Sequence, residues 1–482
     1  MHKQDPESSQ WLPQIIQGGM GVGVSNWRLA KVVSRLGEIG VVSGTAIDAV
    51  VARRLQLGDA DGSIRRALSH FPWPKMAKRF LDNFFIPGGK APHEPFKLMT
   101  LLSLGMKRAR VEQMIVANFV EVFLAKEGHR GIVGINYLEK IQLPTLPSLF
   151  GAMLAGVDIV LMGAGIPLAI PGTLDRLAHW DPVELNIQVE DNTADQAFVY
   201  RLDPREYSSG VRPELSRPKF LAIVASDVIA KTMIRRATGR VDGFVVEGHT
   251  AGGHNAPPRR VGQASGAATT GYSDRDIPDI AKIKKLGRPF WLAGGFASPG
   301  RLKEALALGA NGIQVGTVFA FCDESGIVPA MKEAVLKECI NGTLTVTTDF
   351  QASPTGYPFK IVSLKNNRTS QSEPGRRERI CDLGYLRELY CKDESKVGYR
   401  CPSEPVKDYV AKGGREDFTV GKQCLCNGLM ATIGLGQSRG DETELPLITA
   451  GDDFSFVKHL VKSENTHYSA SEAIEYLKPN HS

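Results

Sequence analysis

The sequence predicts an α/β protein whose main body is a (β/α)8 TIM barrel, with a helical insertion after the second strand and a C-terminal appendage. Short, almost wholly apolar runs alternate along the chain with segments of helical periodicity, a pattern typical of a parallel sheet covered by helices. The alternation repeats eight times, and eight units favour a closed barrel over an open doubly wound sheet. Beyond residue 330 the strand signals are too few to extend the barrel.

The expected strands are apolar runs that end at a glycine or a small polar residue. Because parallel strands in a barrel are covered on both faces, they need no alternation of polar and apolar side chains. The runs are PQIIQGG (13–19), IGVVSG (39–44), GIVGIN (131–136), VDIVLMGAG (157–165), FLAIVAS (220–226), VDGFVVEG (241–248), RPFWLAGG (288–295) and NGIQVGT (311–317).

Helix ends are expected where a capping residue precedes, or a glycine follows, a segment of helical spacing. Ser25 is a candidate N-cap for a helix that ends at Gly37, and a second helix over 111–128 ends at Gly128. The segment SPGRLKEALALG, 298–309, begins with serine at the N-cap and proline at the first helical position, and it closes with glycine.

Two regions lie outside the eightfold repeat. Residues 59–110 interrupt the second β/α unit with a helix-rich insertion, and long insertions in barrel loops commonly cover the mouth of the site, so a lid is expected there. Residues 331–482 hold the loop-like SPTGYPFK and most of the cysteines, and form the C-terminal appendage. The barrel is therefore expected to comprise residues 1–58 and 111–330.

Composition favours a water-soluble cytoplasmic protein. The chain has 482 residues, of which 42% are hydrophobic and 23% charged, and its formal charge of +6 is too small to argue for nucleic acid. The N-terminal MHKQDPESSQW lacks the apolar region of a secretory signal, and no apolar run approaches the length of a membrane span. The seven cysteines fit reduced thiols in a cytoplasm better than a disulfide framework.

Glycines and polar residues gather where the expected strands end, which in a barrel is the mouth that carries the active site. Exposed main-chain amides there can cradle a phosphate, and although any one glycine pair is more simply a tight turn, several clusters at one end favour a phosphorylated cofactor. The sequence GGMGVG, 18–23, lacks the spacing of a dinucleotide loop, and no P-loop is present. The clusters are Gly18-Gly19-Met20-Gly21, Asn136, Ser226, Glu247 to His254, Gly294-Gly295 and Gly316-Thr317.

The ordered series PQIIQGGMG, GIN, GAGIP, EGHTAGGH, LAGG and IQVGT resembles the nitronate monooxygenase family, once called 2-nitropropane dioxygenases. The resemblance covers residues 12–323 and implies an FMN-dependent barrel that oxidises alkyl nitronates with O2. The insertion and SPTGYPFK are similar to a larger branch that holds flavin enoyl reductases of polyketide and polyunsaturated fatty-acid synthases. An enoyl-thioester reductase that uses NAD(P)H, with acyl carrier protein as a possible partner, is therefore the alternative.

The resemblance also assigns roles to individual residues. Met20 and its neighbouring glycines would lie beside the isoalloxazine ring, and Asn136 would hydrogen-bond the flavin. Glu247, where the family usually has glutamine, would contact FMN. The remaining cofactor residues are Gly252 and Gly253, which follow the sixth strand, and Gly294, Gly295, Gln314, Gly316 and Thr317, which would hold the phosphate.

His254, which closes AGGH, matches the family's active-site histidine. Its imidazole would bind the nitronate oxygens or carry a proton, or in a reductase would stabilise the enolate or protonate the carbon. A histidine that only caps the turn is the alternative. The usual neighbours of the motif are changed, because Thr250 replaces an acid and Asn255 a glycine, which leaves His254 without an adjacent carboxylate.

Other candidate residues are weaker. His249 is either structural or part of the pocket wall, and Tyr357 and Lys360 either reach the mouth to contact substrate or belong to a surface loop. Thiolates at Cys381, Cys401, Cys424 and Cys426 are weak candidates for a zinc or iron–sulfur site, since a C-x-C pair is present without a CxxC, and ordinary buried thiols are favoured. A non-catalytic flavin-binding barrel that acts through its insertion and tail stays open as a different class of function.

Overall fold

The computed structural model describes residues 12–192, 196–259, 271–365, 378–393, 396–462 and 466–479. The N-terminal MHKQDPESSQW and Arg260, which closes the glycine-rich stretch after the sixth barrel strand, lie outside these ranges. The expectation about a secretory signal therefore falls outside the described residues as well. No helix among the residues described is long and apolar enough to cross a membrane.

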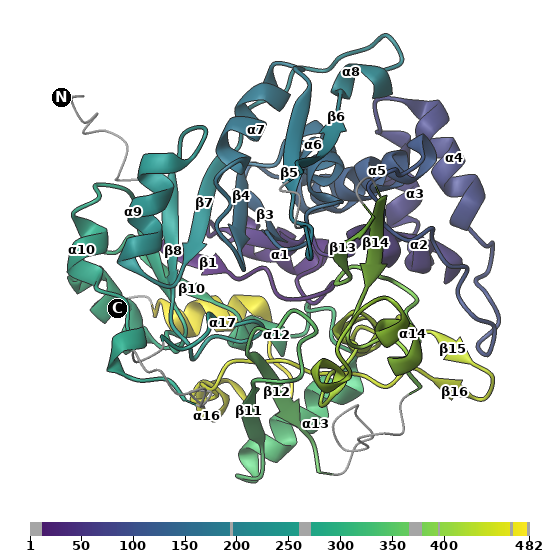
Figure 1. The fold of residues 1–482 in the computed structure, drawn as a ribbon. Coiled ribbons are helices and arrows are strands. Elements are labelled where there is room, and N and C mark those ends of the chain that lie inside the picture. The colour runs from purple at the N-terminus through teal and green to yellow at the C-terminus, as the bar shows by residue number, and fades with distance from the viewer. Residues whose placement is uncertain are drawn as a thin grey trace.

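Eight parallel strands form the predicted barrel, which confirms the fold class (Figure 1). Their order around the sheet is β1-β10-β9-β8-β7-β4-β3-β2, and a bridge between Ile16 and Ile39 joins the two ends. At that seam the Gln17 amide donates to the Ile39 carbonyl at 3.0 Å, and the Ile39 amide donates to the Ile15 carbonyl at 3.0 Å. The strands are β1 (Ile15–Gln17), β2 (Gly40–Ser43), β3 (Val133–Leu138), β4 (Ile159–Gly163), β7 (Lys219–Val224), β8 (Gly243–Glu247), β9 (Phe290–Ala293) and β10 (Gly312–Val315).

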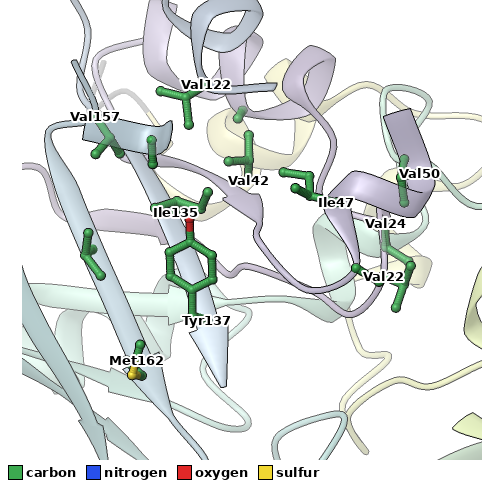
Figure 2. Packing of buried hydrophobic residues seen from close by; sticks show 14 of the residues in the cluster. Val22, Val24, Val42, Ile47, Val50, Val122, Ile135, Tyr137, Val157 and Met162 are labelled. Atoms are coloured by element: carbon green, nitrogen blue, oxygen red, sulfur yellow. The ribbon is translucent and has the colours of Figure 1, made fainter. Parts of the chain in front are cut away.

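The barrel strands bury both of their faces, which explains their unbroken apolar sequences. Inside the barrel a small cluster includes Ile16, Leu161 and Trp291, all of them nearly or wholly buried. Outside the strands a larger cluster joins them to the helices, as Figure 2 shows for Ile135 on β3 and Val122 on α5. The two layers fix the strand positions and so fix where each strand ends.

Helices cover the outside of the barrel, and the three that the sequence predicts over 25–37, 111–128 and 298–309 are among them. Gly37, Gly128 and Gly309 follow three of these helices with φ values of +85°, +81° and +90°, as expected for glycine at a helix end. The helices are α1 (Trp27–Arg35), α5 (Arg108–Lys126), α6 (Thr145–Leu154), α7 (Ile170–Ala178), α8 (Pro204–Tyr207), α9 (Asp227–Arg236), α10 (Ile280–Lys284), α11 (Pro299–Ala307) and α12 (Thr317–Ala320), with a 3-10 turn at Asp274–Asp276.

The predicted N-cap of α1 is wrong by one residue. Asn26 caps this helix, because its side-chain oxygen accepts from the Leu29 amide at 3.0 Å. Ser25 does not cap the helix, because its hydroxyl donates to the Gly18 carbonyl in the loop after β1 at 2.8 Å. Ser298 caps α11 as predicted and accepts from the Arg301 amide. Ser226 caps α9 in the same way, which gives it a structural task.

The insertion lies on the outer side of the barrel. It follows α2 (Ile47–Gln56) and contains α3 (Ser63–Ser69) and α4 (Pro74–Phe84), which pack against α5 and α2. Its irregular end is tied to the C-terminal part of the chain, since the Tyr399 hydroxyl accepts from the Leu104 amide at 2.7 Å. In Figure 1 these purple and blue helices lie beside the barrel, whereas the green and yellow C-terminal part lies below it.

The C-terminal part is built from short elements that the sequence pattern does not reveal. Its last helix returns to the barrel, where Lys478 pairs with Glu38 at 2.6 Å, so the segment wraps around the barrel. Its elements are α13 (Pro329–Ile340), β11 (Thr345–Asp349), β12 (Phe359–Ser363), β13 (Glu388–Asp393), β14 (Lys396–Arg400), α14 (Val406–Ala411), a 3-10 turn (Glu416–Thr419), α15 (Leu425–Thr432), β15 (Ser438–Arg439), β16 (Glu442–Thr443), α16 (Val457–Leu460) and α17 (Ala470–Leu477). A further hairpin, β5 (Val183–Ile187) with β6 (Phe198–Leu202), lies between β4 and β7.

Candidate functional site

A cavity with about 1650 Å³ of empty space, part of it open to solvent, lies at the carboxyl ends of the barrel strands. This is the mouth at which barrels of this type carry their sites. All residues that the sequence proposed for cofactor binding line this cavity, and so does His254. The cofactor set is Gly18, Gly19, Met20, Gly21, Asn136, Glu247, Gly252, Gly253, Gly294, Gly295, Gln314, Gly316 and Thr317.

The loop after β1 is fixed by a buried hydroxyl. Ser25 donates to the Gly18 carbonyl at 2.8 Å and accepts from the Met20 amide at 2.9 Å. Gly19 packs so closely on β3 that a Cβ there would lie 2.3 Å from the Asn136 Cβ. The glycine is therefore required for the approach of this loop to Asn136, independently of any ligand.

Two buried amide oxygens at this cavity find no partner among the described residues. Asn136 donates through Nδ2 to the Gly19 carbonyl at 3.0 Å, which leaves its Oδ1 as an unpaired acceptor. The Oε1 of Gln314 on β10 is unpaired in the same way. A buried acceptor without a donor costs about 1–3 kcal/mol, so each oxygen is suited to accept from an N–H or O–H of a bound molecule.

Glycines after β9 keep one side of the cavity free of side chains. Gly294 and Gly295 have φ values of +88° and +70°, which other residues rarely adopt. A Cβ on Gly294 would lie 2.9 Å from the Gly248 carbonyl oxygen and 3.0 Å from the Thr250 Oγ1. The neighbouring Thr317 Oγ1 accepts from the Gly451 amide at 2.9 Å, which ties the barrel to the C-terminal segment at this point. We call the part of the cavity beside Gly294 and Gly295 the hollow. It can take a group that approaches main-chain amides closely, as a phosphate does.

Glu247 ends β8 at the cavity wall. Burial raises the pKa of its carboxyl to about 7, because desolvation disfavours the charged form. Near neutral pH a substantial fraction of this side chain is therefore protonated and can donate a hydrogen bond. A glutamine amide in the same place would also donate a hydrogen bond.

His254 is largely buried, and its ring has a hydroxyl partner that the sequence did not reveal. Its Nε2 lies 2.7 Å from the Ser353 Oγ, and its ring meets the Phe359 ring edge-on at a centroid distance of 4.8 Å. Burial, with a smaller contribution from the charge of Lys140, lowers the pKa of the imidazole to about 3. The ring is therefore neutral at physiological pH, so an imidazole that binds nitronate oxygens would do so by a hydrogen bond rather than as a cation.

The loop SPTGYPFK, 353–360, reaches the site through residues other than those proposed from the sequence. Tyr357 lines a second, adjoining cavity and not the first one, and Lys360 is buried in an ion pair with Asp452 at 2.6 Å. His249 does not line the first cavity either, because its ring stacks on Tyr272 with centroids 4.5 Å apart. Sequence reasoning singled out the right loop but missed Ser353, since one serine carries no distinguishing pattern.

The cavity is roofed by the C-terminal segment. None of the lining residues comes from 59–110, a range that the structure describes in full, so the lid expected from the insertion is absent from this wall. The cover comes instead from residues 385–453, which the sequence gave no reason to place there. They are Tyr385, Leu386, Leu425, Cys426, Leu429, Thr449, Ala450, Gly451 and Asp453.

The cysteine-rich segment forms no metal centre in the part of the chain that is described. There, no three histidine, cysteine, aspartate or glutamate side chains are grouped so that they could hold a metal ion. All seven cysteines are free thiols. Burial raises the pKa of Cys381 to about 11 and that of Cys426 well above its usual value, so these groups are protonated packing residues.

Parts of the chain are similar to a family model and to curated proteins. Residues 213–367 match the family model described as nitronate monooxygenase. A nitronate monooxygenase of Pseudomonas aeruginosa is 26% identical over 185 residues, which cover 38% of this chain and 48% of the relative. The (3aS,4S,5R,7aS)-5-hydroxy-7a-methyl-1-oxo-octahydro-1H-indene-4-carboxyl-CoA dehydrogenase of Mycobacterium tuberculosis is 28% identical over 246 residues, which cover 48% of this chain and 64% of the relative.

Among solved structures, nitroalkane oxidase from Streptomyces ansochromogenes is 15% identical with a TM-score of 0.40, and the match covers 97% of this chain and 94% of that one. The chain aligns with about half of the length of the curated relatives. The sequence matches confirm the resemblance to the nitronate monooxygenase family, which is a family of oxidoreductases.

Proposed function

We propose that the protein is an FMN-dependent oxidoreductase that oxidises alkyl nitronates with O2. The observation that carries this proposal is the pairing of a glycine-lined hollow with two unpaired buried acceptors, Asn136 Oδ1 and Gln314 Oε1, in the same cavity as His254. The sequence match to nitronate monooxygenase supports the same conclusion.

The residues present fit FMN. Asn136 and Gln314 offer acceptors for ring or ribityl donors, and Gly294, Gly295 and Gly316 offer main chain to a phosphate. A bound flavin would supply reversible electron transfer. A partly protonated Glu247 adds a donor at the end of β8. These roles rest on the contacts of the chain and on the family resemblance together.

The chain's own contribution to the reaction centres on His254. A neutral imidazole has one N–H and one acceptor nitrogen, and its Nε2 is hydrogen-bonded to the Ser353 hydroxyl. The remaining ring nitrogen is left to hydrogen-bond a substrate oxygen or to exchange a proton with substrate. The Phe359 ring packs edge-on against the imidazole, and Leu386 and Leu429 add apolar side chains to the wall of the same cavity.

The second candidate is a flavin-dependent enoyl-thioester reductase. It would use NAD(P)H, and acyl carrier protein is its possible partner. The neutral state of His254 favours it, because a thioester carbonyl needs a hydrogen-bond donor, whereas an anionic nitronate gains more from a cation. The CoA-thioester dehydrogenase among the relatives supports this candidate as well. We propose the cytoplasm as the location for either function.

Anaerobic reduction of the purified yellow protein distinguishes the candidates. Bleaching by an alkyl nitronate without NAD(P)H supports the monooxygenase, and bleaching by NAD(P)H without nitronate supports the reductase. If neither donor reduces the bound flavin, the protein is better regarded as a non-catalytic flavin-binding barrel. Protein that stays colourless and binds no added FMN contradicts the proposal as a whole.

A further inference from the structure

A second cavity adjoins the first and is more polar. Its lining includes Lys140, Glu139 and Tyr357, together with residues of the C-terminal segment. Ile141, Tyr385 and Leu386 line both cavities and form the wall between them. The proposed function uses only the first cavity, so the charged groups of the second have no task assigned to them.

A row of side-chain polar atoms connects the two cavities through the loop 353–360. The His254 Nε2 lies 2.7 Å from the Ser353 Oγ, and this hydroxyl lies 2.8 Å from the Thr355 Oγ1. Lys140 on the other side donates from Nζ to the Thr355 Oγ1 at 3.4 Å, a long hydrogen bond. The Thr355 Oγ1 also lies 3.4 Å from the His254 Nε2, so the imidazole is joined to the ammonium group by Thr355, with Ser353 as the shorter contact on the histidine side.

The two hydroxyls are held in place by the main chain around them. The Thr355 amide donates to the Ser353 Oγ at 3.2 Å, and Lys422 donates from Nζ to the Ser353 carbonyl at 2.9 Å. The loop is fastened to the AGGH turn, because the Asn255 amide donates to the Pro358 carbonyl at 3.0 Å. Ser353 itself is fully buried. The row is therefore a fixed part of the site rather than a chance contact of a surface loop.

Lys140 has the chemical properties that a proton carrier needs. Burial lowers the pKa of its ammonium to about 7, and the charge of Glu139 opposes that shift only in part, so both protonation states are populated near neutral pH. The ring of Tyr357 lies directly against the ammonium. The other titratable or charged groups that line this cavity are Glu190, Glu388, Arg387, Tyr385 and Tyr399.

We propose that Lys140, Thr355 and Ser353 form a proton relay that connects His254 to the second cavity. This inference rests on the proposed function, in which His254 exchanges a proton with the substrate. It adds Lys140 as a relay residue and the two hydroxyls as positioning and transfer groups, which neither the sequence motifs nor the first cavity assign.

In the reducing direction each group of the relay gives up one proton and takes one. The His254 ring gives a proton to the substrate carbon while Nε2 takes the proton of the Ser353 hydroxyl. Ser353 takes one from Thr355, Thr355 takes one from the Lys140 ammonium, and water in the second cavity returns one to Lys140. One proton moves from solvent to substrate, and the electron pair comes from NAD(P)H. With a neutral nitroalkane as substrate, the same groups pass its proton outward, and O2 is the electron acceptor.

The test compares substitutions that remove proton transfer with substitutions that keep it. Lys140→Met removes the carrier, and Lys140→Arg keeps the charge on a group that does not deprotonate in proteins. Thr355→Val breaks the row, and Thr355→Ser restores a hydroxyl. With a neutral nitroalkane, or with an enoyl thioester and NAD(P)H, we expect turnover to fall at least tenfold in Lys140→Met, Lys140→Arg and Thr355→Val, with Thr355→Ser close to the wild type. An alkyl nitronate is already deprotonated, so its turnover should change much less in these variants. Lys337→Met, at an exposed lysine paired with Glu333, is the control and should keep full turnover.

The relay also predicts effects that a purely structural role would not produce. Bound flavin should stay constant across the set, the pH at which kcat changes should move in the Lys140 variants, and added ethylamine should restore part of the activity of Lys140→Ala. Turnover of the neutral nitroalkane or the enoyl thioester within twofold of the wild type in both Lys140→Met and Thr355→Val, in folded protein that its donor still reduces, overturns the relay and leaves the proposed function intact.

A measurement on the protein without substrate tests whether Lys140 and His254 interact. Histidine NMR should show the pKa of His254 rising in Lys140→Met and not in Lys140→Arg, because the nearby positive charge disfavours the imidazolium. If the pKa of His254 is unchanged in Lys140→Met, the two side chains do not interact, and the relay is overturned. This result holds even if neither donor reduces the flavin.

Discussion

Gly19→Ala tests the close approach between the loop after β1 and strand β3. The new Cβ would lie 2.3 Å from the Asn136 Cβ and 3.1 Å from the Val41 Cγ1. Non-bonded carbons lie about 3.5 Å apart or more, so the loop or Asn136 must move by about 1.2 Å. Asn136 is poorly able to move, because its backbone pairs with Ser43 on β2 and Leu161 on β4.

The expected cost of this substitution has two parts. Overpacking in a filled site costs about 1–3 kcal/mol, which for a chain of this length lowers the Tm of the FMN-free protein by about 1–3 °C. Displacement of the Asn136 side chain also removes the acceptor Oδ1, and loss of one hydrogen bond of about 1.4 kcal/mol weakens FMN binding about tenfold. Thermal unfolding measures the first part, and quenching of flavin fluorescence measures the second.

Gly18→Ala is the matched control in the same loop. A Cβ on Gly18 would have its nearest atom, the Val315 carbonyl oxygen, at 3.5 Å, which is an ordinary contact. The control should therefore unfold within about 0.5 °C of the wild type. If Gly19→Ala is as stable as Gly18→Ala and binds FMN equally well, the contact between Gly19 and Asn136 does not constrain the site, and the argument from it is refuted.

Three further predictions concern the cavity. His254→Ala should keep bound FMN and lose about 10²–10⁴-fold in turnover, since its task is proton handling, and unchanged turnover would remove it from the mechanism. Gly294→Val should release FMN, because its side chain would enter the hollow beside Gly248. Gly300→Val, with open space around the position, is the control and should retain FMN. An absorbance spectrum of each purified protein measures the bound flavin. Glu247→Gln should raise Tm more at pH 8 than at pH 5. The folded-state pKa of Glu247 lies above its unfolded value, so stability from this group is lost as pH rises towards about 7, and the amide removes a cost of roughly 1–3 kcal/mol. An equal effect at both pH values would show that the carboxyl is not desolvated.

Much of the candidate site could be predicted from local sequence, for physical reasons that particular residues illustrate. Gly294 and Gly295 stand at positive φ after a buried strand, and only glycine adopts that backbone without strain, so the pattern of residues carries the geometry. The sequence pattern placed Asn136 at the end of its strand, and a closed barrel brings all strand ends to one mouth, although β3 continues two residues further to Leu138. Gln314 followed only from the family resemblance.

The partners of these residues could not be predicted in this way. Tyr357 and His249 were sensible candidates, yet one lies in the adjoining cavity and the other is stacked on Tyr272. The short hairpins of the C-terminal segment, such as β15 with β16, have too few residues to show a periodicity. The placement of the other C-terminal residues over the mouth depends on contacts with the barrel, such as that between the Gly451 amide and the Thr317 Oγ1, rather than on local preference.

The sequence by itself determined the eight strands, the ends of several helices and the glycines of the hollow, because apolar runs, caps and positive φ are properties of neighbouring residues. Only the tertiary structure decided which groups meet His254. Ser353 lies 99 residues along the chain from it, and Lys140 lies 215 residues from Thr355, so no pattern within a segment relates them. It also decided that the C-terminal segment, and not the insertion, covers the cavity. Contacts between distant segments form only where the packed barrel brings their surfaces together, and that packing decides both the protonation state of His254 and the groups with which it can exchange a proton.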